Sequence, residues 1–191
     1  MISTKHLEQL IEAAIFSSVK PLSVKDIKEK LLAHYEVSTP VIKQAITNIE
    51  KHYQSRGVYL VEVASGFQFQ IKAEHNEDIA RLTEEKPQKY SRALLETLAL
   101  IAYKQPITRS EIEDVRGVAV SSQIIKTLIE REWIKVLGHK EVPGRPSMYG
   151  TTKAFLDYFS LKSLEQLPEL IPIEESSIVN GTMQDIMASN E

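Results

Sequence analysis

The chain has 191 residues, of which 42% are hydrophobic and 26% charged, and its formal net charge is -3. This is the composition of an ordinary globular protein. It contains no cysteine and only 7 glycines, which excludes disulfide frameworks, cysteine-ligated metal sites, thiol nucleophiles and glycine-rich phosphate loops. No apolar run approaches the roughly 20 residues that span a bilayer, and no signal-peptide core is present. We expect a cytoplasmic protein of one or two small domains, without membrane contact.

Two parts of the chain resemble each other. Residues 20–27 (KPLSVKDI) align with residues 105–112 (QPITRSEI), and residues 37–46 align with residues 120–129. Each pair follows an apolar run with helical spacing and precedes a β-rich stretch. Because a repeated order of elements indicates a repeated structural unit, we predict two modules, each with the order helix, helix, helix, hairpin.

The second and third helices of each copy are expected to begin at a hydroxyl side chain that caps the first turn. These N-cap residues are Ser23 and Thr39 in the first copy, and Thr108 and either Ser121 or Ser122 in the second. Asp26 and Glu111 follow at capping-box spacing, and Pro40 suits the first helical position. Gly117 is placed to end a helix in the left-handed conformation.

Apolar residues at helical spacing give each copy a stripe that can face a core. The residues expected to face inward are Leu7, Leu10, Ile11, Ala14, Ile15, Ile42, Ala45, Ile46 and Ile49 in the first copy, and Leu94, Leu95, Leu98, Ile101, Ala102, Ile125, Leu128 and Ile129 in the second. The helices of each copy can therefore share one core.

A β-hairpin follows the third helix in each copy. Residues 58–63 and 67–71 flank a tight turn, and residues 133–137 and 147–151 flank a longer, glycine-bearing loop. Three helices with such a hairpin make a winged helix. The predicted fold class is mainly α with small β-hairpins (α+β), as two tandem winged-helix domains.

Polar stretches divide the chain. We predict a first module at residues 1–85, a linker at 86–90 around Pro87, and a second module at 91–162. In residues 163–191, Ser163 and Gln166 have the spacing to cap a short helix, and an acidic tail that we expect to be disordered follows.

The sequence offers no catalytic or metal-binding constellation. Its five histidines are dispersed, and no spacing places two of them on one helix face. The acid pairs Glu84-Glu85 and Glu113-Asp114 lie in a linker and on a helix, where they more often form solvated surfaces than catalytic dyads. We therefore predict a protein that is not an enzyme, with no catalytic residue, metal ligand or cofactor.

A winged helix raises the possibility of DNA binding, which the charge distribution does not favour. Residues 1–85, 86–162 and 163–191 carry net charges of -2, +5 and -6. The third helices offer polar residues near acidic ones: Lys43, Gln44, Asn48 and Glu50 in the first copy, and Gln123, Lys126, Glu130, Arg131 and Glu132 in the second. Because phosphate contacts supply most of the affinity for DNA, we expect at most weak, non-specific, salt-sensitive binding.

The segment at residues 140–152 (KEVPGRPSMYGTT) is the most distinctive in the chain. As a wing, it can use Gly144 for a positive φ, and Pro146 should hold Arg145 extended. Tyr149 can pack as a strand residue. An arginine fixed in this way can also make bidentate contacts with a carboxylate or phosphate.

The sequence resembles the family of segregation and condensation protein B. The resemblance is carried by residues 95–112 (LETLALIAYKQPITRSEI), 115–118 (VRGV), 144–152 (GRPSMYGTT) and 161–168 (LKSLEQLP), with weaker support from residues 11–16 and from Gly66-Phe67. It implies a non-enzymatic homodimer that binds a kleisin, segregation and condensation protein A. Through the kleisin it implies contact with the structural-maintenance-of-chromosomes ATPase, and a role in chromosome condensation and segregation on the nucleoid.

Given these implied partners, we predict two kinds of contact surface from the residues of the chain. Kleisin contacts are expected on the second module, at Tyr103, Lys104, Arg109, Arg116, Gly144, Arg145 and Tyr149. Dimer contacts are expected on the first module, at Tyr53, Tyr59 and Phe67. A tandem winged-helix transcription regulator stays open as the alternative function, and an enzyme as a second one.

Overall fold

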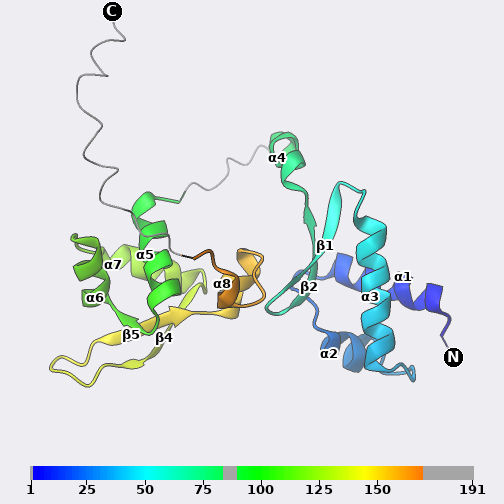
Figure 1. The fold of residues 1–191 in the computed structure, drawn as a ribbon, viewed down its shortest axis with the longest axis horizontal. Coiled ribbons are helices and arrows are strands. Elements are labelled where there is room, and N and C mark those ends of the chain that lie inside the picture. The colour runs from blue at the N-terminus through cyan, green and yellow to red at the C-terminus, as the bar shows by residue number, and fades with distance from the viewer. Residues whose placement is uncertain (1, 84–89, 170–191) are drawn as a thin grey trace, which may run out of the picture.

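The computed structural model describes residues 2–83 and 90–169 (Figure 1). In the first module the helices and strands are α1 (Thr4–Ser17), α2 (Val24–Asp26), the π-helical turn η1 (Ile27–Leu31), α3 (Thr39–Tyr53), β1 (Val58–Val63), β2 (Gly66–Ile71), the 3-10 turn η2 (Ala73–His75) and α4 (Asn76–Thr83). Helical segments precede the hairpin in the predicted order. Helix α4 was not predicted.

The second module repeats this order, with additions. Its elements are α5 (Arg92–Lys104), β3 (Ile107–Thr108), α6 (Arg109–Arg116), α7 (Ser122–Glu130), β4 (Ile134–His139), β5 (Ser147–Thr151) and α8 (Lys153–Tyr158), and the 3-10 turn η3 (Leu164–Gln166) follows. The predicted α+β class, helical with small antiparallel sheets, is confirmed. The exact module boundaries stay a prediction.

Each module has its own antiparallel sheet. Strands β1 and β2 pair from Val58 opposite Ile71 to Val63 opposite Gly66, next to the turn. In the second module the strand order is β3-β5-β4, and a bulge interrupts the ladder between Val136 and Gly138. The wing is thus part of a three-stranded sheet rather than a free hairpin.

Two separate hydrophobic cores hold the described residues together. The first contains Leu7, Ile11, Ile15, Ile27, Leu32, Ile42, Ala45, Ile46, Ile49 and Leu60. The second contains Leu94, Leu98, Ile101, Ala102, Ile107, Ile112, Val120, Ile125, Leu128, Trp133, Ile134 and Phe155. The apolar stripe predicted for the third helix of the first copy is confirmed, because all four of its residues are buried in α3.

Two residues predicted to face the core do not. Leu95 on α5 and Ile129 on α7 are each 42% exposed. Both lie at the edge of the apolar stripe of their helix, next to Leu94 and Leu128, which are buried. The sequence prediction was wrong for these two positions because a helix buries a narrower stripe than its run of apolar residues.

The predicted caps are nearly all present. Thr108 and Glu111 form a complete capping box, Ser23 accepts a hydrogen bond from the Asp26 amide, and Ser121 caps α7. Gly117 ends α6 with a φ of 69°. Helix α3, however, starts one residue early: its N-cap is Ser38, not Thr39.

None of the helices in the described ranges is long and apolar enough to cross a membrane.

Candidate partner-binding surfaces

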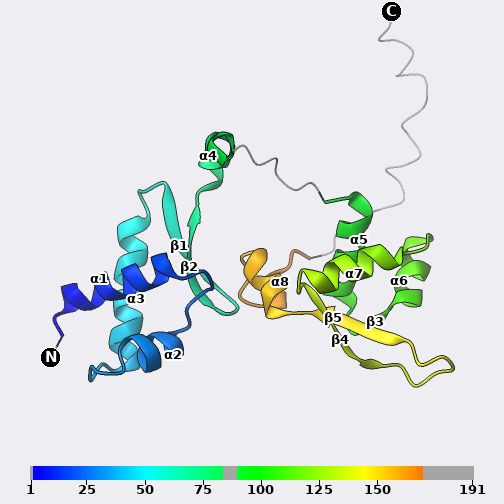
Figure 2. The same ribbon diagram turned by 180° about the vertical axis from the view of Figure 1, so that it is seen from behind.

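The residues predicted to contact a partner lie in three places on the second module. Tyr103 and Lys104 end α5, Arg109 and Arg116 begin and end α6, and Gly144, Arg145 and Tyr149 belong to the wing. The wing extends away from α8 (Figures 1 and 2), whereas Tyr103 at the end of α5 lines a groove together with Phe155 of α8. The structure therefore does not bring these residues into one site.

An apolar groove of about 290 Å³ runs between α5 and the chain that follows α8. It is lined by Leu95, Leu98, Ala99, Ala102, Tyr103, Phe155, Phe159, Leu161, Leu167 and Pro168. The Tyr103 hydroxyl donates a hydrogen bond of 2.7 Å to the carbonyl of Pro168, which holds residues 167–168 against α5. Leu95 and Phe159 are 42% and 39% exposed. The groove can therefore accept apolar side chains from outside.

The two arginines of α6 differ in accessibility. Arg109 is exposed and bonds Glu113 (Nε to Oε1, 2.9 Å) and Ser122 (3.1 Å). Arg116 has a side chain only 9% exposed and pairs with Glu96 on α5 (Nη2 to Oε2, 3.1 Å). Its Nε atom is buried and has no hydrogen-bond partner within the described residues. Arg116 therefore holds α6 against α5 and presents little surface to a partner.

Two carboxyl groups of this helix pair, those of Glu96 and Glu111, have lowered pKa values because neighbouring groups donate hydrogen bonds to them. Hydrogen bonds from Arg92 and then Arg116 lower the pKa of the Glu96 carboxyl. The Lys140 ammonium and the Thr108 cap lower the pKa of Glu111 to about 2. These carboxylates stay ionised at neutral pH and link the wing base, α6 and α5.

The wing tip has a conformation that the sequence prediction missed. Arg145 has a φ of 38°, in the left-handed region, where the prediction placed an extended residue. Gly144 also has a positive φ, and the amide of Arg145 donates to the Val142 carbonyl, which closes the turn. The turn hydrogen bonding outweighs the preference that Pro146 imposes on the residue before it.

The side chain of Arg145 is 70% exposed and bonds Glu141 (Nη2 to Oε1, 3.0 Å). Tyr149, in contrast, lies in β5 and packs against the second core. Among the predicted wing contacts, Arg145 and its neighbour Gly144 are thus exposed, and Arg145 is the one that presents an accessible side chain.

The aromatic residues predicted as dimer contacts are half-buried. The Tyr53 hydroxyl donates to Glu12 (2.5 Å), which raises the pKa of Tyr53, and its ring lies 4.7 Å from that of Phe69. Tyr59 donates to Gln70 (2.9 Å), and the backbone of Phe67 pairs with Leu22. These side chains stabilise the first module from within.

Sequence reasoning missed two strongly exposed apolar residues of this module, at the end of α1 and just after it. Phe16 is 69% exposed and Val19 fully exposed. Phe16 lines a shallow pocket with Gln9, Glu12, Ala13 and Tyr53. The exposure of Phe16 could have been predicted from the sequence, because Phe16 lies outside the helical stripe of Leu7, Ile11 and Ile15 that faces the core.

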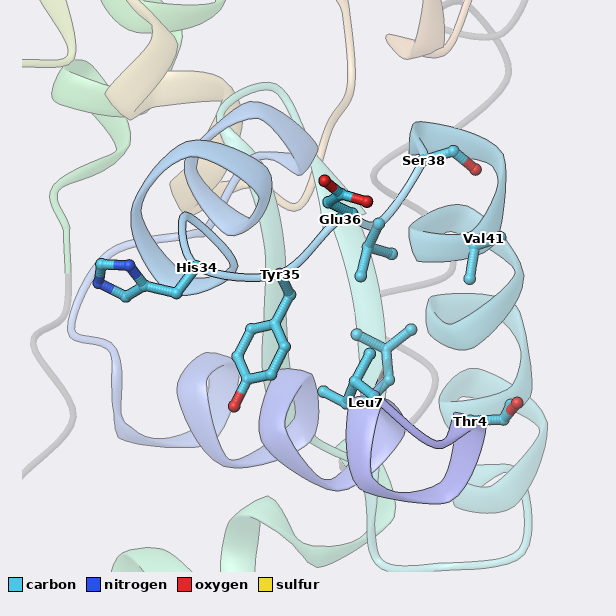
Figure 3. Close-up of a pocket in the computed structure, with 9 residues that line it drawn as sticks. Thr4, Leu7, His34, Tyr35, Glu36, Ser38 and Val41 are labelled. Carbon is cyan, nitrogen blue, oxygen red and sulfur yellow. The ribbon is translucent and has the colours of Figure 1, made fainter.

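A second pocket of the first module, about 560 Å³, lies between the start of α1 and the start of α3. Figure 3 shows Tyr35 directed toward α1, Ser38 and Val41 on the first turn of α3, and His34 directed away from the other labelled side chains. Glu36 is the one carboxylate among its lining residues. The pocket contains none of the residues that the sequence predicted to contact a partner.

The third helices use their polar residues within the chain. On α3, Gln44 bonds Asn48, and Asn48 donates to Glu8 on α1 (2.6 Å). On α7, Lys126 lies 3.7 Å from Glu130. Within residues 2–83 and 90–169, no group of three or more histidine, aspartate or glutamate side chains is arranged to hold a metal ion.

Comparison with protein families decides the relationship of the chain. Residues 9–170 match the family described as segregation and condensation complex subunit ScpB. The chain belongs to this family. A ScpB homologue from Coxiella burnetii is 54% identical over 161 residues, which cover 84% of this chain and 77% of the relative. ScpB from Myxococcus xanthus is 39% identical over 91% of this chain and 52% of its own length.

Solved structures also show similarity to this ScpB-family chain. ScpB from Mycobacterium tuberculosis is 25% identical, with 84% of this chain and 99% of that chain covered and a TM-score of 0.38. A dimer of a ScpB N-terminal domain complexed with a ScpA peptide is 24% identical over 46% of this chain and 100% of that chain, with a TM-score of 0.37. Family membership rests on the sequence matches.

Proposed function

We propose that this chain is a non-enzymatic subunit of a condensin-like complex that binds a kleisin, segregation and condensation protein A. Through the kleisin it would join the structural-maintenance-of-chromosomes ATPase and support chromosome condensation and segregation, in the cytoplasm on the nucleoid. Family membership supports the assignment. The observation that carries it on the molecule is the open apolar groove between α5 and the chain after α8.

The groove suits an apolar helix face of the kleisin. Its lining is almost wholly apolar, and Lys104, exposed at the end of α5, lies beside Tyr103 at its edge. A kleisin segment that orders on binding loses about 2–5 kcal/mol, whereas each fully buried leucine-sized side chain contributes about 1.5–3 kcal/mol. Two or three apolar anchors would therefore offset the cost of ordering.

We also propose that the chain is a homodimer joined through the first module. The exposed Phe16 and Val19 leave apolar surface there that a second copy would cover. Sedimentation equilibrium of the full chain should give the mass of a dimer at tens of micromolar. A monomer at that concentration, or a dimer that Phe16→Glu leaves intact, would contradict this surface.

The wing arginine supplies a test of kleisin binding on the second module. In Arg145→Ala, affinity for the kleisin should fall about thirtyfold, since loss of one arginine from a desolvated charge pair costs about 2 kcal/mol. The melting temperature should hardly change, because exposed substitutions shift stability by no more than about 0.5 kcal/mol. Calorimetric titration and thermal melts measure the two quantities.

Lys135→Ala, an exposed cation on β4 of the same hairpin, is the matched control and should bind the kleisin normally. Unchanged affinity in Arg145→Ala would remove the residue from the interface. A large fall in melting temperature would make it a structural wing residue. An absence of binding by the unaltered chain would overturn the proposed function.

A sequence-specific transcription regulator is less well supported. Base readout needs free polar side chains near the start of the recognition helix. Here Gln44 in the second turn of α3 bonds Asn48, and Gln123 in the first turn of α7 bonds Thr127. Side chains bonded within their own helix favour weak, salt-sensitive contact with DNA at most.

A further inference from the structure

Polar contacts join the hairpin turn of the first module to the chain around the end of α8, where both ribbon views place the two side by side (Figures 1 and 2). We call these contacts the latch. They are Ala64 N to Leu161 O (2.9 Å), Ser65 N to Asp157 Oδ1 (2.9 Å), Gln70 Nε2 to Ser160 Oγ (2.7 Å), and Lys162 Nζ to Glu62 Oε2 (2.5 Å). All of them are polar, so the latch can open without exposing a hydrophobic core.

Ser160 occupies a backbone position that normally favours glycine. The amide of Leu161 donates to Leu156 O and that of Ser160 to Asp157 O, which is the Schellman pattern of a helix end. Ser160 is the residue in the left-handed conformation, with a φ of 58°. A non-glycine residue is disfavoured there. Its hydroxyl, however, exchanges hydrogen bonds with Gln70 of the first module, which glycine could not do.

The segment that carries the latch also forms a wall of the apolar groove. Asp157, Ser160 and Lys162 contact the first module. Phe159 and Leu161, which alternate with them, line the groove of the second module. Residues 157–162 therefore contact both modules, the first through polar atoms and the groove of the second through the Phe159 and Leu161 side chains.

We propose that the latch is a conformational device that couples occupation of the groove to the relative orientation of the two modules. When the latch is closed, Phe159 and Leu161 are held in place and the groove is formed. When it opens, the orientation of the two modules relative to each other changes and the groove wall loosens. The inference has two parts. The partner side, which concerns a partner bound in the groove, rests on the proposed function. The orientation side, which concerns how the two modules are held in the free chain, does not. Coupling of this kind is reciprocal, so latch contacts on the first module must affect affinity at the second.

The orientation side is tested in the free chain with Ser160→Gly, which removes the hydroxyl contact and relieves the left-handed strain. The chain has no cysteine, so spin labels can be placed through Lys51→Cys on α3 and Ser110→Cys on α6, with unlabelled chain in excess. Double electron–electron resonance should give a narrow distribution of distances between the two labels in the parent and a broader one in Ser160→Gly. The melting temperature of Ser160→Gly should not fall.

Ser163→Gly is the matched control, because Ser163 lies three residues away and its side chain makes no capping hydrogen bond. It should keep the narrow distribution. An equally narrow distribution in Ser160→Gly, or an equally broad one in the parent, would overturn the latch.

The partner side is tested by charge reversal at a position outside the groove. Glu62→Lys faces Lys162 with a like charge and should lower kleisin affinity about fivefold, the lower range of allosteric coupling. Adding Lys162→Glu restores the pair and should restore the affinity. Full affinity in the single variant, or no recovery in the double variant, would overturn the coupling. If the parent does not bind the kleisin at all, the proposed function fails, while the distance measurement still decides the latch.

Discussion

Replacement of Gly66 by alanine is expected to unfold the first module, or to lower its melting temperature by more than about 12 °C. Gly66 begins β2 with a φ of 144°. An added Cβ would lie 2.3 Å from the carbonyl carbon and oxygen of Leu22 and 2.5 Å from the Ser23 amide. Backbone cannot yield as a flexible side chain does, so we expect a loss of about 3 kcal/mol or more.

The added Cβ would separate Leu22 from Phe67, which exchange two backbone hydrogen bonds of 3.0 and 2.9 Å next to Gly66. Circular dichroism melts of the full chain measure the resulting loss of stability. Gly138→Ala is the control: its Cβ would meet only the Met148 Cε atom at 3.7 Å, an ordinary contact. A Gly66→Ala protein that melts at the same temperature as its parent would show that the backbone at Leu22 can move aside at little cost.

Substitution of Leu95 by lysine is expected to lower affinity for the kleisin about a hundredfold. Leu95 lines the apolar groove and is 42% exposed, so the change should leave folding intact. Loss of an apolar anchor, together with a charge placed against apolar walls, should cost about 3 kcal/mol of binding free energy. Calorimetric titration with the kleisin measures the change.

Ile129→Lys makes the comparison specific. Ile129 lies on a helix of the same module and is also 42% exposed, but it does not line the groove. It should bind the kleisin with unchanged affinity. Equal losses in both variants would point to a general effect of charge, and unchanged affinity in Leu95→Lys would place the kleisin elsewhere.

Local chemistry made the fold predictable from the sequence. Caps such as Thr108 with Glu111, and the glycine that ends α6, act within a few residues and leave a recognisable spacing. Alternation in residues 67–71 likewise predicted β2. Strand β3 was not predicted because two residues are too few to show a periodic pattern. Helix α8 was not predicted either, although its N-cap residue Thr152 could have indicated where it begins.

The surfaces were harder to predict because they depend on residues distant in the chain. From its place at a helix end, Arg116 would be expected to be exposed. Its guanidinium instead donates a hydrogen bond to Glu96, twenty positions earlier in the chain, and is buried between the two helices. The groove joins Leu95 to Phe159 and Pro168, which no local pattern connects. Of the predicted contacts, Tyr103 lines the groove and Arg145 is accessible at the wing. Their roles stay predictions.

The single tryptophan of the chain lies where an optical signal would be most informative. Trp133 is buried in the second core, and its ring lies 4.6 Å from that of Tyr158 and 5.5 Å from that of Phe159. Tyr90, the last residue of the predicted linker, packs on it from another side, with the ring centroids 5.2 Å apart. Tryptophan fluorescence therefore reports on one module only, at the junction of linker, latch and groove. The unlabelled chain carries its own probe of how these three regions respond to a partner.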